Sequence, residues 1–228
     1  MLPTLLMLVT ATGCMALAAW QLQRAADKRA TGEAIAAWWD AAPTPVGEVA
    51  DWRSLEFRHV TVRGVLEHDR AFHLGDRVRG GRRGIDVITP LRLERGDTRL
   101  LVNRGWLAAA APESGEQPVE LTGHIAIVQP PAIRLGPGIS PESDAWHADW
   151  AWLDLETFRA RSGQPALPVV LRLDGDSEAA LAANWPKPKS DPGMHIGYAI
   201  QWLAFALIAL VLWGRGLVRR PQPAGVSA

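Results

Sequence analysis

Two long apolar runs bracket the chain and separate a membrane part from a polar part. The first runs from Leu2 to Trp20 and the second from Ile196 to Trp213, and neither contains a charged residue. Each is close to the roughly 20 residues that a helix needs to cross the apolar core of a bilayer. The pattern therefore predicts transmembrane helices at residues 1–20 and 195–213, a polar region at 21–194 and a tail at 214–228.

Within the polar region, apolar and polar residues alternate over short stretches, as they do in half-buried strands. Val60, Val62 and Leu66, for example, fall on one side of the first stretch. The expected strands are 57–67, its hairpin partner 70–75, 84–93 and 98–106 around a turn at 95–97, 118–128 and 167–173. Short strands at this spacing favour an antiparallel sheet that rolls into a barrel or sandwich.

Helical patterns are fewer. Residues 25–39 are expected to extend the first membrane helix, and 154–163 to form a helix with Asp154 as its N-cap and Gly163 as its stop. Residues 176–184 are a short helical candidate. The stretches 75–84 and 130–144 are expected loops, the first of them at the tip of a hairpin. The fold class is thus a membrane protein in which two transmembrane helices flank a β-rich α+β domain.

Charge gives the expected orientation. All 24 acidic residues lie within 21–195 together with 21 of the 24 basic ones, so this region carries −3, while the tail carries +3 through Arg215, Arg219 and Arg220. Basic segments next to a membrane span stay in the cytoplasm. We therefore expect both termini in the cytoplasm and the β-rich domain on the outer side, although Arg24, Lys28 and Arg29 oppose this.

Cys14 is the only cysteine, and it lies in the first span. The polar region therefore has no disulfide framework, no cysteine metal site and no c-type heme attachment. An amphipathic, arginine-rich presequence is absent, which favours a bacterial inner membrane, where the polar region would be periplasmic. A cleaved signal peptide or a lipoprotein site at 11–14 is the alternative for the first span, but its long apolar run favours a retained anchor.

No enzyme signature emerges. The stretch 75–84 lacks the Gly-Lys-Ser/Thr ending of a phosphate loop, and no Gly-x-Ser-x-Gly elbow is present. We therefore expect no catalytic residues and no nucleic-acid partner. Four histidines could meet as metal ligands, although their spacing does not require it: His68, His73, His124 and His147. Arg104, two residues before Trp106, could bind a carboxylate or an aromatic face, but it is expected to pair with an internal acid and fix the turn.

His195 stands at the entrance to the second span. A neutral imidazole nitrogen is a common axial ligand of heme iron. Helical spacing places Tyr198, Ala199 and Trp202 on its face, which offers a ligand, a small gap and two aromatic walls to a flat macrocycle. The alternative is an interfacial histidine in an aromatic belt. Gln201 faces elsewhere and is expected to hydrogen-bond to the first span.

Several segments resemble one known family along the whole chain. They are "AAWQLQRAADK" (18–28), "LEFRHVTVRG" (55–64), "GIDVITPL" (84–91), "LLVNRGW" (100–106), "WLDLE" (152–156), "NWP" (184–186) and "HIGYAIQW" (195–202). Each is a modest motif, but their order and topology are similar to those of the Surfeit locus protein 1 family of cytochrome c oxidase assembly factors.

The resemblance implies a non-enzymatic inner-membrane factor that binds heme a and assists its insertion into the catalytic subunit of the heme-copper oxidase. It implies that His195 is a heme ligand, with Tyr198 and Trp202 as pocket walls. The oxidase catalytic subunit, heme a synthase and membrane lipid are the partners that it implies. The alternative function is a heme-free scaffold that stabilises an oxidase assembly intermediate. Copper delivery is disfavoured because soft sulfur ligands are lacking.

Overall fold

The protein is described here from a computed structural model that covers the chain except residues 1, 47–50, 95, 110–113, 130–148 and 219–228. It forms two compact units, one of residues 1–35 with 188–228 and one of residues 36–187. Each unit is considered by itself. The expected loop at 130–144 and His147 lie outside the described residues.

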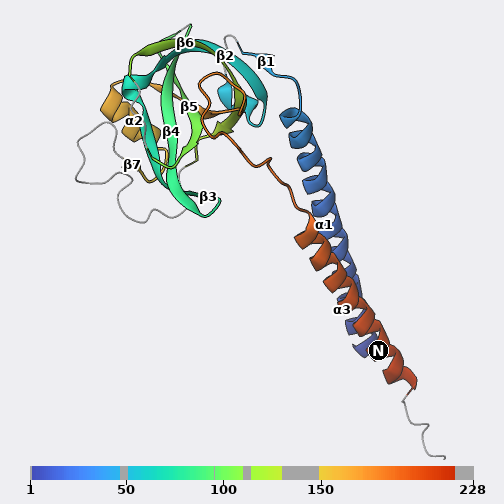
Figure 1. Cartoon of the computed structure of the whole chain (residues 1–228). Coiled ribbons are helices and arrows are strands. Elements are labelled where there is room, and N and C mark those ends of the chain that lie inside the picture. Colours follow the sequence, from blue (N-terminus) through green and yellow to red (C-terminus); the bar gives the residue numbers. More distant parts are fainter. Residues whose placement is uncertain (1, 47–50, 95, 110–113, 130–148, 219–228) are drawn as a thin grey trace, which may run out of the picture. The chain divides into compact units, whose positions relative to one another are not determined.

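The first unit is a pair of antiparallel helices. α1 (Leu2–Trp39) and α3 (Gly193–Val218) lie side by side, with Gln21 next to His195 and Thr4 next to Trp213 (Figure 1). Both are long and apolar enough to cross a membrane. Their leucines are largely exposed, so the helices need an apolar surrounding such as a bilayer. The expected extension of the first helix to Trp39 is confirmed.

The two helices meet along a seam with alternating spacings of three and four residues, the repeat that keeps one stripe facing a partner helix. Most positions in this stripe are small, which lets two membrane helices approach closely. The buried members on α1 are Met7, Ala11, Cys14, Ala18, Gln21 and Ala25, and the α3 side carries His195, Ala199, Trp202, Ala206, Ala209 and Trp213.

The second unit is built on a closed barrel. The strands are β1 (Thr44–Pro45), β2 (His59–Glu67), β3 (Phe72–Arg79), β4 (Arg82–Leu93), β5 (Arg99–Leu107), β6 (Glu116–Ile127), β7 (Asp149–Trp150) and β8 (Ala166–Leu173), and two single turns of 3-10 helix cover Trp52–Leu55 and His68–Arg70. The strands of the ring are, in order, β2, β6, β8, β5 and β4, and the pairing of β4 with β2 closes it (Figure 1). All neighbours in the ring are antiparallel except β5 and β8. The predicted β-rich fold is confirmed.

The barrel has two apolar layers because its strands alternate. Val60, Val62 and Leu66 point inward, as predicted, and pack with inward residues of the other four strands. A second cluster around Phe72 and Trp150 lies outside the ring and is covered by Phe158 of α2 (Leu155–Ser162). The caps of α2 match the prediction: Asp154 accepts from the backbone of Glu156 and Thr157, and Gly163 is left-handed with φ 67°.

Two predictions of local structure are wrong. The strand at 70–75 does not form a hairpin with 57–67, because β3 pairs with β4 and β7. The stretch 75–84 is the tip of that β3–β4 hairpin, as expected, and its strands continue to a turn at Gly80 and Gly81. The stretch 176–184 is not helical. Its backbone is bound instead to β5, through Leu181 N–H to Arg104 O at 2.7 Å and an isolated bridge between Ala182 and Trp106.

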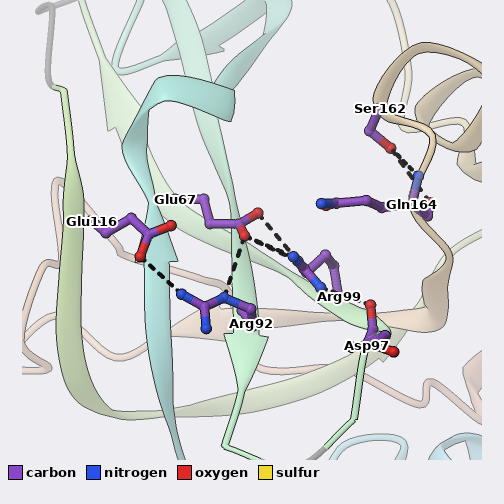
Figure 2. Close-up of polar contacts among 7 residues, drawn as sticks. All are labelled: Glu67, Arg92, Asp97, Arg99, Glu116, Ser162 and Gln164. Carbon is purple, nitrogen blue, oxygen red and sulfur yellow. Dashed lines mark hydrogen bonds and ion pairs between the residues drawn. The ribbon is translucent and has the colours of Figure 1, made fainter.

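Four charged side chains meet where β2, β4, β5 and β6 come together (Figure 2). Glu67 and Glu116 are direct cross-strand partners, an arrangement that is unfavourable for two like charges. Arg99 donates to Glu67 from Nε and Nη2 at 2.9 to 3.2 Å, and Arg92 donates to Glu116 at 2.8 Å (Figure 2). The arginines neutralise the pair, and both Glu67 and Arg99 are buried.

We expect Arg99→Met to lower the free energy of unfolding by about 3–5 kcal/mol, because it leaves the Glu67 carboxylate buried without its main partner. The matched control is Arg63→Met, whose arginine pairs with Glu120 at 3.0 Å on an exposed surface. Its expected cost is at most about 1 kcal/mol. Denaturant unfolding of the full chain in detergent, followed by tryptophan fluorescence, measures both. Equal losses of unfolding free energy in the two variants would contradict the greater importance of the buried Arg99–Glu67 pair.

The barrel closes at a glycine. A Cβ at Gly64 would lie 2.3 Å from the carbonyl oxygen of Arg92, on the strand that β2 must pair with to complete the ring. Gly64→Ala is therefore expected to destabilise the domain by about 1–3 kcal/mol. Gly175→Ala, where the nearest atom is 3.4 Å away, should change the unfolding free energy by less than about 0.5 kcal/mol. The same unfolding experiment distinguishes the two.

Candidate functional site

The predicted ligand His195 lies in the first turn of α3, and it is oriented by the other helix. Asp191 starts this helix by accepting from Gly193 N–H at 2.7 Å. Within this first turn, Nδ1 of His195 lies 2.8 Å from Oε1 of Gln21 on α1. A carboxamide oxygen only accepts, so Nδ1 carries a proton, and in the neutral ring Nε2 keeps its lone pair. The imidazole is thus held in the tautomer that can bind a metal ion.

The remaining residues on the predicted face are divided between two environments. Ala199 is 1% exposed because α1 packs against it, so the expected small gap is filled by the other helix. Trp202 is half-buried in the same seam and makes an edge-to-face contact with Phe205. Tyr198 is 47% exposed and lies outside the seam. The open flank next to His195 is therefore the one that carries Tyr198.

The polar contact between the helices is made by a different glutamine from the expected one. Gln201 is exposed rather than turned toward the first span, while Gln21 is buried in the seam. The signal in the sequence was the spacing of Cys14, Ala18, Gln21 and Ala25, which places Gln21 on the packed stripe of α1.

Arg104 has structural partners, as expected, and the described ones are a carbonyl and an imidazole where an acid was expected. It is buried, its Nε donates to the carbonyl of Ala179 at 2.8 Å, and its Nη1 lies 3.4 Å from Nδ1 of His68. Gly105 follows with φ 120°, and a Cβ there would lie 2.8 Å from the Ala182 backbone. Trp106 donates from its indole to the carbonyl of Arg77 at 3.0 Å. These residues attach the segment before Trp185 to β5.

Of the four histidines considered as metal ligands, the three that lie among the described residues do not gather as one group. His68 contacts Arg104 and Gln117, and His73 lies on β3. His124 meets His59 and Asp174, neither of which the sequence analysis singled out as a ligand. Burial acts to raise the pKa of Asp174, but hydrogen bonds from His124 and His59, with the charge on these rings, outweigh it and hold the pKa below its usual value.

Comparison with known proteins identifies the family. A model described as the SURF1 family matches residues 8–207 of the chain. The chain belongs to the SURF1 family. It is 29% identical to a SURF1-like protein of Monosiga brevicollis over 91% of this chain and 87% of the relative.

Other relatives have similar coverage. A SURF1-like protein of Drosophila melanogaster is 27% identical, with 94% of this chain and 77% of the relative covered. Surfeit locus protein 1 of Rattus norvegicus is 25% identical, with 90% of this chain and 72% of the relative covered. The match to the SURF1 family thus covers residues of both helices and the barrel.

The seam predicts which cysteine pairs can be cross-linked. In a Cys14→Ser background, Ala18→Cys with Ala199→Cys should form a disulfide upon oxidation in membranes, because both alanines are buried between the helices. Ala18→Cys with Ala204→Cys is the control, since Ala204 is exposed on another side of α3. Peptide mass spectrometry detects the cross-link. A cross-link of equal yield in the control would contradict this helix packing.

Proposed function

We propose that this SURF1 protein is a cytochrome c oxidase assembly factor that binds heme a and delivers it to the catalytic subunit of the oxidase. The hydrogen bond between His195 and Gln21 carries the proposal. In this proposal the protein binds and delivers heme a and catalyses no reaction. Heme a synthase is the expected source of the heme, and the oxidase catalytic subunit receives it.

The residues at the start of α3 fit a heme. Nδ1 of His195 is occupied by Gln21 at 2.8 Å, so the nitrogen left for iron is Nε2. Such a second contact on a ligating histidine fixes its ring and raises its basicity as a ligand. Tyr198 supplies aromatic surface on the open flank next to it, which suits an apolar macrocycle, and Trp202 adds the part of its ring that the seam leaves exposed. When bound, heme iron supplies an axial coordination position for the imidazole.

A single protein ligand suits a carrier. Among the residues that the structure describes, the helix pair contains one histidine, His195, and its cysteine, Cys14, is buried in the seam. One axial bond leaves the second axial position to water or to a receiving protein, so the cargo can be exchanged. Two strong axial ligands on the same protein would oppose release.

The proposed location is a bacterial inner membrane. The exposed leucines of α1 and α3 support insertion of both helices. The basic residues that follow Trp213 favour a cytoplasmic C-terminus, and two spans then return the N-terminus to the same side. In this orientation the barrel is periplasmic. The curated relatives described above are eukaryotic, where the corresponding compartment differs.

The first test is the absorption spectrum of the full chain, purified in detergent from cells that synthesise heme a. The wild type should show Soret and alpha bands of heme a, and His195→Ala should lose most of this absorbance because its only proposed iron ligand is gone. Two colourless proteins that both support oxidase assembly would overturn heme binding and leave the heme-free scaffold.

A matched pair of glutamine substitutions separates ligand orientation from general helix effects. Gln21→Leu removes the acceptor for Nδ1 and is expected to weaken heme binding about 10- to 100-fold. Gln201→Leu makes the same chemical change at an exposed position of α3 and should leave heme affinity unchanged. Heme titration followed at the Soret band measures both. Equal affinity in the two variants would contradict the role of Gln21.

A further inference from the structure

A pair of imidazoles lies on the outer face of the barrel, at a place fixed by strand register. His59 at the start of β2 and His124 on β6 are direct cross-strand partners. Their rings are stacked, with centroids 4.6 Å apart and planes 7° from parallel. Asp174 follows the last residue of β8, and its backbone N–H donates to Thr122 at 3.1 Å, which brings its carboxylate to the same place.

One nitrogen of each ring is occupied by a backbone carbonyl. Nδ1 of His59 lies 2.8 Å from the oxygen of Ala41, and Nε2 of His124 lies 3.0 Å from the oxygen of Trp39. Carbonyl oxygens only accept hydrogen bonds, so both of these nitrogens carry protons. A histidine that donates to a carbonyl in this way is the common arrangement around bound metal ions.

The other nitrogens converge on the carboxylate. Nε2 of His59 lies 2.6 Å from Oδ2 of Asp174, and Nδ1 of His124 lies 3.0 Å from Oδ1. In neutral rings these two nitrogens hold lone pairs, and they face an oxygen acceptor without a hydrogen between them. A proton or a metal ion between nitrogen and oxygen would satisfy both groups.

We propose that His59, His124 and Asp174 form a binding site for one divalent transition-metal ion of the zinc type. Their ligand atoms all lie within 4.8 Å of one another. Two imidazoles and a carboxylate are a usual set of protein ligands for zinc, and three such ligands leave a coordination position open. Because the set has no sulfur, it favours divalent ions over Cu(I).

The site is accessible, and an ion would bring its ligand atoms, which lie within 4.8 Å of one another, to a common spacing. The side chains of His59 and Asp174 are 18% and 19% exposed, so an ion can enter from solvent. Tetrahedral ligands at about 2.1 Å from an ion lie about 3.4 Å apart. His59 Nε2 and Asp174 Oδ2 would therefore separate by about 0.8 Å from their 2.6 Å contact. A small rotation of the carboxylate provides this change.

The surroundings hold the rings and favour a cation. Trp39 stacks on His124 with centroids 3.8 Å apart, which limits rotation of that ring. The carbonyl of Trp39 is also at the C-terminal end of α1, where the helix dipole is negative. The site uses no residue of the proposed heme site, so the two proposals can fail independently.

Isothermal titration of the full chain in detergent with Zn²⁺ tests the site, using protein purified without a histidine tag. One Zn²⁺ per chain should bind, and Asp174→Asn and His59→Gln should each weaken binding by at least about 100-fold, since each removes a direct ligand. His73→Gln is the matched control, because His73 is a barrel histidine outside the cluster. His195→Ala should also leave zinc affinity unchanged.

A spectroscopic measurement makes the test independent of any destabilised variant. Cu²⁺ added to the wild type at one equivalent should give an electron spin echo pattern of two imidazoles, and one imidazole in His59→Gln. Melting curves of each variant without metal identify those that fail to fold. The proposal is overturned if the wild type binds no zinc, or if it binds zinc with equal affinity after Asp174→Asn and His59→Gln. Either result would leave the cluster as an ion pair bridged by protons.

Discussion

The barrel depends on strand β2 pairing along both of its edges. β6 occupies one edge from His59 to Glu67, and β4 occupies the other beside Gly64, Val65 and Leu66. This double pairing turns an open sheet into a ring without a free edge. It encloses the inward-facing Val60, Val62 and Leu66, and it leaves space for a backbone contact at Gly64 that no side chain could share.

The same pairing decides which polar groups meet outside the core. The β2–β6 register sets Glu67 opposite Glu116 at one end and His59 opposite His124 at the other. At the first end arginines from β4 and β5 neutralise the carboxylates. At the second end two imidazoles face the carboxylate of Asp174. No arginine is among the described contacts of this group. The ends thus differ in chemistry although one strand pair builds both.

The helix pair and the barrel present imidazoles by one physical rule. In each case an acceptor-only oxygen holds one ring nitrogen and leaves the other for a ligand: Gln21 for His195, and backbone carbonyls for His59 and His124. The two places differ in how many potential ligand atoms lie together. One imidazole at the end of an apolar span suits a cargo that must leave, whereas two imidazoles with a carboxylate suit an ion that stays.

The sequence by itself determined the elements whose signals are local. Apolar length predicted both membrane helices, alternation predicted the barrel strands, and Asp154 with Gly163 predicted the bounds of α2. His195 stood out by its position at the entrance to the second span, and its role as a heme ligand stays a prediction. Only the tertiary structure decided which strands pair and which distant groups meet. It separated β3 from β2, drew residues 176–184 onto β5, and brought Gln21 to His195 and Asp174 to the two histidines. The physical reason is that periodicity specifies which face of an element is buried, while the partner of that face depends on closing a ring or a helix seam from segments far apart in the chain.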